Sequence, residues 1–276
     1  MLSRPVVAIT GASSGIGAEF ARQLAPEHDF ILIARRKARL EELAERLKRQ
    51  HQANAEILQA DLAEEQELQS AAERIAAEKR LALLINNAGF GIRGRFWETP
   101  LAEQERMHRL HITATLRLTH AALRNMVARD SGGIINVASM AAFVRGAGNV
   151  SYAATKSWMA AFTEGLYLEL RAARSKIVVQ ALCPGYTYSE FHSKLGAEGE
   201  EQRVPRGFWL TAEEVVAASL KGLRRGKLVV VPGWRYQLVN AIVTKLPIPV
   251  RLAFEAAASR PQRERVRVSQ SAPSAG

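Results

Sequence analysis

The sequence predicts an α/β fold: a doubly wound, mostly parallel sheet in a three-layer αβα arrangement, built by a single domain. Seven short apolar runs have the length of buried strands: 6–10, 29–34, 56–60, 81–85, 133–138, 176–182 and 227–231. Between them lie stretches with the 3.6-residue periodicity of helices, at 18–24, 37–50, 64–78, 101–128, 151–171 and 211–223. Strands that alternate with helices predict a parallel sheet covered on both faces.

Length and composition divide the chain into one large domain and a short C-terminal part. Its 276 residues, 47% of them hydrophobic, are enough for one sizeable core. We expect the main domain to span residues 1–232 and an apolar helical extension, 233–258, to lie over or beside a ligand site. Residues 259–276 have no apolar periodicity, and we expect a disordered tail there.

The charge is positive and dispersed. There are 38 Lys and Arg residues against 27 Asp and Glu, a formal net charge of +11. Basic clusters occur at 35–39, 224–227 and 260–267, but no nucleic-acid-binding signature accompanies them, so we expect no nucleic-acid partner. The single cysteine, Cys183, excludes an intramolecular disulfide and thiolate metal sites, and we expect no metal.

The N-terminal residues predict the compartment. They lack the long apolar core of a signal peptide and lead directly into the first strand. No run reaches the 18 apolar residues that a membrane-spanning helix needs. We therefore expect a cytoplasmic protein.

A glycine-rich turn links the first strand to the first helix, where residues 11–17 read G-A-S-S-G-I-G. Glycines permit a tight turn and close approach of a ligand, and the N-terminus of a helix attracts phosphate. The spacing differs from the G-x-G-x-x-G of dinucleotide-binding sites. Glycine also occurs in such loops for steric reasons alone, so this motif leaves both interpretations open.

Two arginines, Arg35 and Arg36, directly follow the second apolar strand. In a βαβ unit, the end of this strand lies beside the ribose of a bound adenine nucleotide. An acidic residue there would accept a hydrogen bond from the 2′-hydroxyl, whereas arginines match a 2′-phosphate. The pair therefore favours NADP(H) over NAD(H). The alternative is that both arginines simply begin a surface helix.

The third and fourth strands also end in polar residues. Asp61, followed by Leu62, could reach an adenine amino group, cap the helix at 64–78, or do both. Residues 86–89 read N-N-A-G, and paired amides such as Asn86 and Asn87 can lock neighbouring strands together and contact a ribose. Carboxyl ends of parallel strands share one edge of the sheet, so these features predict a ligand site at that edge.

Ser139, Tyr152 and Lys156 form the candidate reaction centre. Tyr152 and Lys156 are four residues apart and lie on one face of the predicted helix. We expect the lysine ammonium to lower the pKa of the tyrosine toward the range of a general acid or base. Ser139 follows the fifth strand and could hold a carbonyl oxygen. The alternative is that the Tyr-x-x-x-Lys spacing belongs to an ordinary amphipathic helix.

The ordered combination of motifs resembles the short-chain dehydrogenase/reductase family over roughly residues 5–232. The motifs are T-G-A-S-S-G-I-G at 10–17, N-N-A-G at 86–89, Ser139, Y-A-A-T-K at 152–156 and P-G at 184–185. The resemblance implies a Rossmann-type fold. It also implies that Tyr152 exchanges a proton with the substrate oxygen, Lys156 binds the nicotinamide ribose and lowers the tyrosine pKa, and Ser139 positions the substrate.

Motifs and resemblance together give a set of candidate cofactor-binding residues. They are Gly11, Ser13, Ser14, Gly15, Ile16, Gly17, Arg35, Arg36, Asp61, Leu62, Asn87, Ala88, Gly89, Tyr152, Lys156, Pro184, Gly185 and Thr187.

The sequence departs from the family pattern at two positions. The family usually has an asparagine in an N-x-T-x-T pattern, where it holds a water of the proton relay; here residues 111–115 read H-I-T-A-T. His111 could relay protons itself, leave the relay to a backbone carbonyl, or merely pack. Many NADP-preferring relatives carry Lys or Arg where this chain has Ser14, so Arg35 and Arg36 must carry most of the preference.

These observations predict an NADP(H)-dependent oxidoreductase that transfers a hydride between nicotinamide and a moderately apolar ketone, aldehyde or secondary alcohol. Residues 188–210 are expected to form a lid over the substrate. The alternatives are a catalytically weak NADPH-binding regulator or scaffold and a peripheral membrane reductase on lipid substrates. The membrane alternative comes from the apolar stretch 234–254, for which core or interface packing is the favoured explanation. The family resemblance implies a homodimer or homotetramer.

Overall fold

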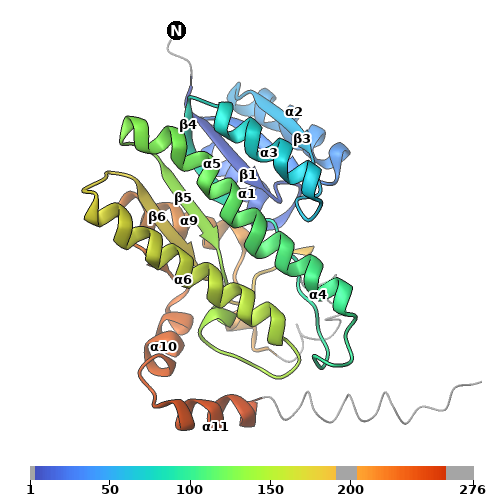
Figure 1. Cartoon of the computed structure of the whole chain (residues 1–276), viewed down its shortest axis with the longest axis vertical. Helices are drawn as coiled ribbons and strands as arrows, with labels where there is room; N and C mark the ends of the chain where they lie inside the picture. Colours follow the sequence, from blue (N-terminus) through green and yellow to red (C-terminus); the bar gives the residue numbers. More distant parts are fainter. Residues whose placement is uncertain (1–3, 191–203, 259–276) are drawn as a thin grey trace, which may run out of the picture.

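The computed structural model describes residues 4–190 and 204–258 and contains a single seven-stranded sheet (Figure 1). The strand order is β3-β2-β1-β4-β5-β6-β7, and every neighbouring pair is parallel. The doubly wound α/β prediction is therefore confirmed. The strands are β1 Val6–Thr10, β2 Asp29–Ala34, β3 Ala55–Gln59, β4 Leu81–Asn86, β5 Gly133–Val137, β6 Val178–Leu182 and β7 Val229–Val230.

Helices cover both faces of the sheet. One face packs against α1 Gly15–Leu24, α2 Lys37–His51 and α9 Ala212–Arg224. The other packs against α3 Glu65–Ala77, α5 Ala114–Arg129 and α6 Val150–Ala172. Helix α2 shows why the sequence folds this way, since its buried residues Leu40, Leu43 and Leu47 recur at the spacing of one helix face.

The chain reverses its direction of winding between β1 and β4, because β2 and β3 lie on one side of β1 and β4 to β7 on the other. Ligands of doubly wound sheets bind at such a point, outside the carboxyl ends of the strands. The glycine turn after β1 and the Asn86-Asn87 pair at the end of β4 lie there.

The helix expected at 101–128 is interrupted. Helix α4 Leu101–His108 passes into a π-helical segment, η1 Arg109–Thr113, which continues into α5. π-Helical turns are rare and often mark functional sites. The interruption places His111 in a fully buried position, where a regular helix had been expected.

The C-terminal extension forms two helices. Helix α10 Trp234–Val243 and helix α11 Ile248–Ala258 are separated by a short connection that ends in Pro247. Among the described residues, no helix is long and apolar enough to cross a membrane.

Two sequence-based expectations fall partly or wholly outside the described residues. These are the lid at 188–210, of which 191–203 are not described, and the tail at 259–276. The two ends of the lid segment are close together, because Thr187 and Leu210 form a parallel β-bridge.

Candidate active site

Ser139, Tyr152 and Lys156 meet at the carboxyl edge of the sheet. Ser139 follows β5, and Tyr152 and Lys156 occupy the first two turns of α6. The Tyr152 hydroxyl is hydrogen-bonded to Ser139. Lys156 Nζ lies 5.8 Å from the centroid of the Tyr152 ring and donates a hydrogen bond to the Val137 carbonyl oxygen at 2.8 Å. The three side chains form one compact group.

The protonation of this group differs from the sequence-based prediction. Burial raises the pKa of Tyr152 to about 12, and the hydrogen bond from Ser139 offsets only part of that effect. Burial also lowers the pKa of Lys156 to about 7. The expectation that lysine lowers the tyrosine pKa is wrong for this arrangement. Desolvation is the dominant cause, and the Lys156 amino group is hydrogen-bonded to the Val137 carbonyl oxygen and not to the phenol.

The position of Ser139 is fixed by its own backbone surroundings. It is the N-cap of a 3₁₀ turn, η2 Met140–Ala142, and its Oγ accepts a hydrogen bond from Ala141 N at 3.1 Å. Met140 N in turn donates to the Pro184 carbonyl oxygen at 2.9 Å. The serine hydroxyl therefore lies on a turn that these hydrogen bonds hold in place, where β5 and β6 end.

A buried amide network holds the strand ends together. Asn86 Nδ2 donates to Asn136 Oδ1 at 2.8 Å, across the paired strands β4 and β5. Asn136 Nδ2 donates to Thr163 Oγ1 of α6 at 2.9 Å. On the other side of β4, Asn87 Nδ2 donates to the Thr10 carbonyl oxygen at 3.0 Å. The asparagines thus lock neighbouring strands, one of the roles that the sequence suggested for them.

His111 uses both ring nitrogens inside the protein. Phe90 N–H donates to Nε2 at 3.2 Å, so the proton resides on Nδ1, which faces Thr155 Oγ1 at 2.8 Å. Thr155 Oγ1 in turn donates a hydrogen bond to the backbone carbonyl oxygen of Tyr152 at 2.8 Å. Burial lowers the pKa of His111 well below its usual value, which keeps the ring neutral. Its ring packs edge-on against Tyr152, with 5.9 Å between centroids.

The glycine turn has the form of a phosphate-binding loop. Gly11 has a φ of +66°, and a Cβ there would lie 2.8 Å from Asn87 Nδ2, so this position requires glycine. The N-cap residue of α1, Ser14, makes no side-chain cap hydrogen bond to the helix. The amides of Gly15, Ile16 and Gly17 thus begin a helix whose dipole favours an anion. This loop fits the diphosphate of a dinucleotide.

The two arginines after β2 point to different partners. Arg36 donates to Ser13 Oγ and Ser14 Oγ, the latter at 2.8 Å, and pairs with Glu190 at 2.7 Å. Arg35 is more exposed and lies 3.7 Å from the Asp61 carboxylate. Arg36 is therefore the arginine that adjoins the glycine turn, a distinction that the sequence left open.

Asp61 does not cap the third helix. The N-cap of α3 is Glu64, while Asp61 Oδ1 accepts from Ala63 N at 3.1 Å and its carboxylate pairs with Arg106. The capping interpretation is wrong because the helix begins four residues later, at Glu65. Leu62 beside it is buried.

The segment after β6 forms a wall of the site. Thr187 is buried and donates to the Gly185 carbonyl oxygen at 3.1 Å. The ring of Tyr236 from α10 packs directly on Gly185, where any side chain would collide with it. Tyr236 Oη accepts from Tyr186 N at 2.9 Å and donates to the Phe208 carbonyl oxygen at 2.7 Å.

Two residues in these contacts, Thr155 and Tyr236, were not singled out in the sequence. Thr155 could have been identified by its place within the Tyr-to-Lys turn. Nothing in the sequence links Tyr236 to Gly185, which lies about fifty positions earlier in the chain.

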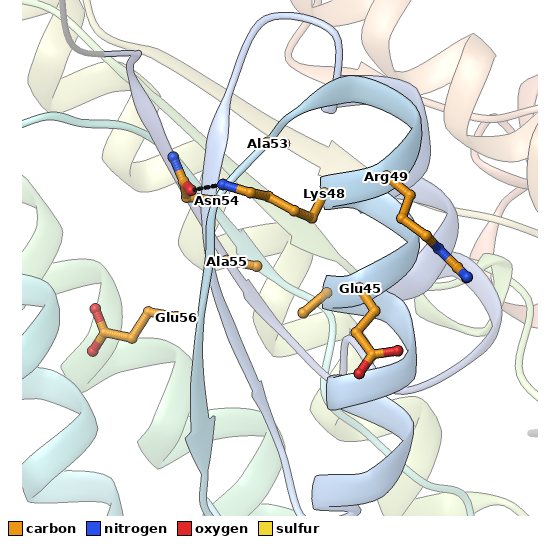
Figure 2. Close-up of a pocket in the computed structure, with 8 residues that line it drawn as sticks. Glu45, Lys48, Arg49, Ala53, Asn54, Ala55 and Glu56 are labelled. Atoms are coloured by element: carbon orange, nitrogen blue, oxygen red, sulfur yellow. Dashed lines mark hydrogen bonds between the residues drawn. The ribbon is translucent and has the colours of Figure 1, made fainter.

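An open depression lies away from this site. It has a volume of about 570 Å³ and lies between α2 and β3 (Figure 2). Lys48 Nζ there donates a hydrogen bond to Asn54 Oδ1 at 2.8 Å. Its charged residues, Glu45, Lys48, Arg49 and Glu56, are of mixed sign and contain no nucleophile beside a base. It lies at the β3 edge of the sheet, four strands from β5, so the functional site is not there.

The fold and the site define an oxidoreductase that uses a nicotinamide cofactor, and the comparisons with known proteins agree. The family model of short chain dehydrogenases matches residues 5–200, and this chain belongs to that family. A short-chain dehydrogenase from Sphingobium yanoikuyae, solved in complex with NADPH, is 34% identical, with a TM-score of 0.78 and coverage of 88% of this chain and 97% of that one.

Two further relatives cover most of the chain. The bulky-bulky ketone specific alcohol dehydrogenase from Comamonas testosteroni is 29% identical, with a TM-score of 0.74 and coverage of 99% of this chain and 96% of that one. The 3-oxoacyl-(acyl-carrier-protein) reductase of Aquifex aeolicus is 28% identical over 219 residues, which are 78% of this chain and 88% of that protein.

Proposed function

We propose that this protein is an NADP(H)-dependent reductase of a moderately apolar ketone or aldehyde, and in reverse a dehydrogenase of the matching alcohol. One observation carries the proposal: Ser139, Tyr152 and Lys156 form one group at the carboxyl edge of the sheet, beside the glycine turn. A hydroxyl, a phenol and an amine there serve proton transfer to an oxygen atom.

Each side chain has a distinct role in reduction. The bound nicotinamide supplies the hydride for the carbonyl carbon. Tyr152 donates its phenolic proton to the carbonyl oxygen, and Ser139 donates a hydrogen bond to the same oxygen. The resulting phenolate is stabilised by the hydrogen bond from Ser139, and solvent returns the proton. Lys156, held by the Val137 carbonyl oxygen, is left to bind the nicotinamide ribose. With its pKa at about 12, Tyr152 is a phenol at neutral pH, the form that reduction requires.

The NADP preference rests on Arg36. Its guanidinium already binds the hydroxyls of Ser13 and Ser14 at the glycine turn, and a planar fork there suits a 2′-phosphate. The NADPH complex of the Sphingobium relative supports this assignment. Asp61 forms ion pairs with Arg35 and Arg106, and its proposed role is to contact the adenine of the cofactor.

His111 acts as an anchor and not as a proton relay. Both nitrogens are already engaged, one by Phe90 and one by Thr155, and the ring is neutral. Through Thr155 it holds the backbone of Tyr152, and through Phe90 it holds the loop after β4. His111 is therefore a positioning residue.

Aromatic side chains gather in the segment that follows β6, which favours an apolar substrate. Tyr188 stacks on Trp209 with 4.9 Å between centroids, and Tyr186 lies 5.3 Å from the same ring. The Comamonas relative, named for bulky-bulky ketones, supports a substrate with two large substituents.

The outer surfaces of two helices suit an oligomer. Leu116 of α5 and Leu168 of α6 are exposed apolar side chains that would be covered in a homodimer or homotetramer.

A substrate panel tests the proposal. Consumption of NADPH should be fastest with ketones that bear two bulky apolar groups and slower with small polar aldehydes. NADH should be used less well. Tight NADPH binding without turnover of any carbonyl compound would contradict the proposal and favour a cofactor-binding regulator.

A further inference from the structure

The two C-terminal helices expose an unusual amount of apolar surface. We call the exposed side chains of α10 and α11 the C-terminal apolar face; they are Trp234, Leu238, Ile242, Ile248, Val250, Leu252 and Phe254. Trp234 is 65% exposed, Ile248 63% and Phe254 56%. In the described part of the chain, seven of the fifteen exposed large hydrophobics lie in these 21 residues. Such a concentration marks an interaction surface.

The exposed apolar side chains form one stripe on α10 and are spread around the exposed sides of α11, where they recur at every second residue. Trp234, Leu238 and Ile242 follow one another at four-residue steps on α10, while Tyr236 and Val243 are buried toward the protein. At 10 and 11 residues, α10 and α11 are too short to cross a bilayer. Apolar side chains that include Trp and Phe suit the boundary between headgroups and acyl chains.

The charges around the face have one sign. Residues 234–254 contain Arg235, Lys245 and Arg251 and no acidic residue. The acidic residue that follows, Glu255, is buried, and its Oε1 accepts a hydrogen bond from Arg145 N at 2.9 Å. The whole chain carries a net charge of +11. A second copy would bring the same cations to a symmetric contact, where they would repel, so the charge pattern favours an anionic partner.

The face lies at the end of the molecule where the active site opens. Figure 1 shows α10 and α11 beyond the carboxyl end of β5, at the same end as the start of α6. Tyr236 fastens α10 to Tyr186 and Phe208, and Glu255 fastens α11 to Arg145 in the segment between Ser139 and Tyr152. A surface that binds these helices would therefore face the substrate walls.

We propose that the C-terminal apolar face docks this protein on an anionic phospholipid surface, with the carboxyl edge of the sheet turned toward the lipid. Apolar side chains enter the interface while the exposed Arg235 and Lys245 bind the headgroups. The docking rests on the exposed helices and does not depend on the proposed reaction. Its consequence for the reaction is that apolar substrates reach the site from the membrane.

Vesicle co-sedimentation tests the docking. The full chain should bind vesicles of phosphatidylcholine with phosphatidylglycerol, bind pure phosphatidylcholine at least about tenfold more weakly, and be released by high salt. The double substitution Leu238→Glu/Phe254→Glu should reduce binding to anionic vesicles by about tenfold or more. The matched control is Leu101→Glu/Val127→Glu, which adds the same two charges at exposed apolar positions of α4 and α5 and should bind as the wild type does.

Three results would overturn the proposal. The wild type could fail to bind anionic vesicles; Leu101→Glu/Val127→Glu could lose binding to the same extent; or the wild type could form a dimer that Leu238→Glu/Phe254→Glu dissociates, without any vesicle binding. The last result would assign the face to a second copy. Circular dichroism and NADPH binding verify that each variant is folded, and these readouts separate a failure of docking from a failure of the proposed function.

Discussion

At the scale of single residues, burial determines the pKa of Tyr152 more than the neighbouring lysine does. The sequence correctly places Ser139, Tyr152 and Lys156 together, because spacing along a helix and strand-end position are local properties. It does not predict the pKa, since desolvation depends on what the rest of the chain packs around the phenol. Here the tyrosine pKa is raised to about 12 and the lysine pKa is lowered to about 7.

The lysine pKa predicts how stability depends on pH. Between about pH 7 and its ordinary value of 10.5, unfolded Lys156 holds a proton that the folded protein releases, so stability rises with pH. Above pH 9, the raised pKa values of Cys183 and Tyr152 act in the opposite direction. Lys156→Met should remove a rise of roughly 2 kcal/mol between pH 7 and 9.

Thermal melts across that range measure the effect. Lys37→Met, at an exposed lysine of α2, serves as the control and should keep the rise. Equal slopes for wild type and Lys156→Met would contradict the lowered lysine pKa.

Arg36 carries a second prediction at this scale. Arg36→Ala should weaken NADPH binding by about tenfold or more, because a charged contact to the 2′-phosphate is lost, and should leave NADH binding nearly unchanged. Fluorescence titration with both cofactors measures this. Arg39→Ala, an exposed arginine paired with Glu42 three residues further along α2, should alter neither. Equal losses for NADPH and NADH would show that Arg36 does not bind the 2′-phosphate.

At the scale of elements, the helix that runs into α5 illustrates what local periodicity omits. Apolar spacing predicts one helix over 101–128, but a π-helical segment interrupts it at Arg109–Thr113. The cause is a set of distant contacts, because His111 is held by Phe90 and Thr155 and its ring lies against Tyr152. For the same reason, no local pattern showed that His111 would be an anchor.

Substitution of His111 tests the anchoring role. His111→Ala leaves Phe90 N–H and Thr155 Oγ1 without their partner, which should cost about 2–4 kcal/mol of unfolding free energy and lower kcat. The shape of the pH–rate profile near neutral pH should stay the same, since the ring is neutral there. Loss of a limb of that profile would indicate a relay. His108→Ala, at an exposed histidine one turn earlier, should change neither property.

At the scale of the whole molecule, most of the architecture could be predicted from the sequence. Alternating strands and helices give the parallel sheet, and polar residues at strand ends locate the site, because these signals are periodic and local. The structure of the C-terminal stretch was harder to predict from the sequence. Its apolar residues suggest packing in the core or in an interface, and the structure divides the stretch into α10 and α11 and leaves seven large side chains exposed. Only the packed molecule reveals which apolar residues remain uncovered.

The most direct test of the central claim is the turnover of Tyr152→Phe. Phenylalanine keeps the ring that packs against His111 and removes only the phenolic hydroxyl. Reduction of a bulky ketone should then fall by about a thousandfold or more, while NADPH binding and thermal stability stay close to those of the wild type. Turnover within a few-fold of the wild type would show that Tyr152 is not the proton donor and would contradict the proposed mechanism.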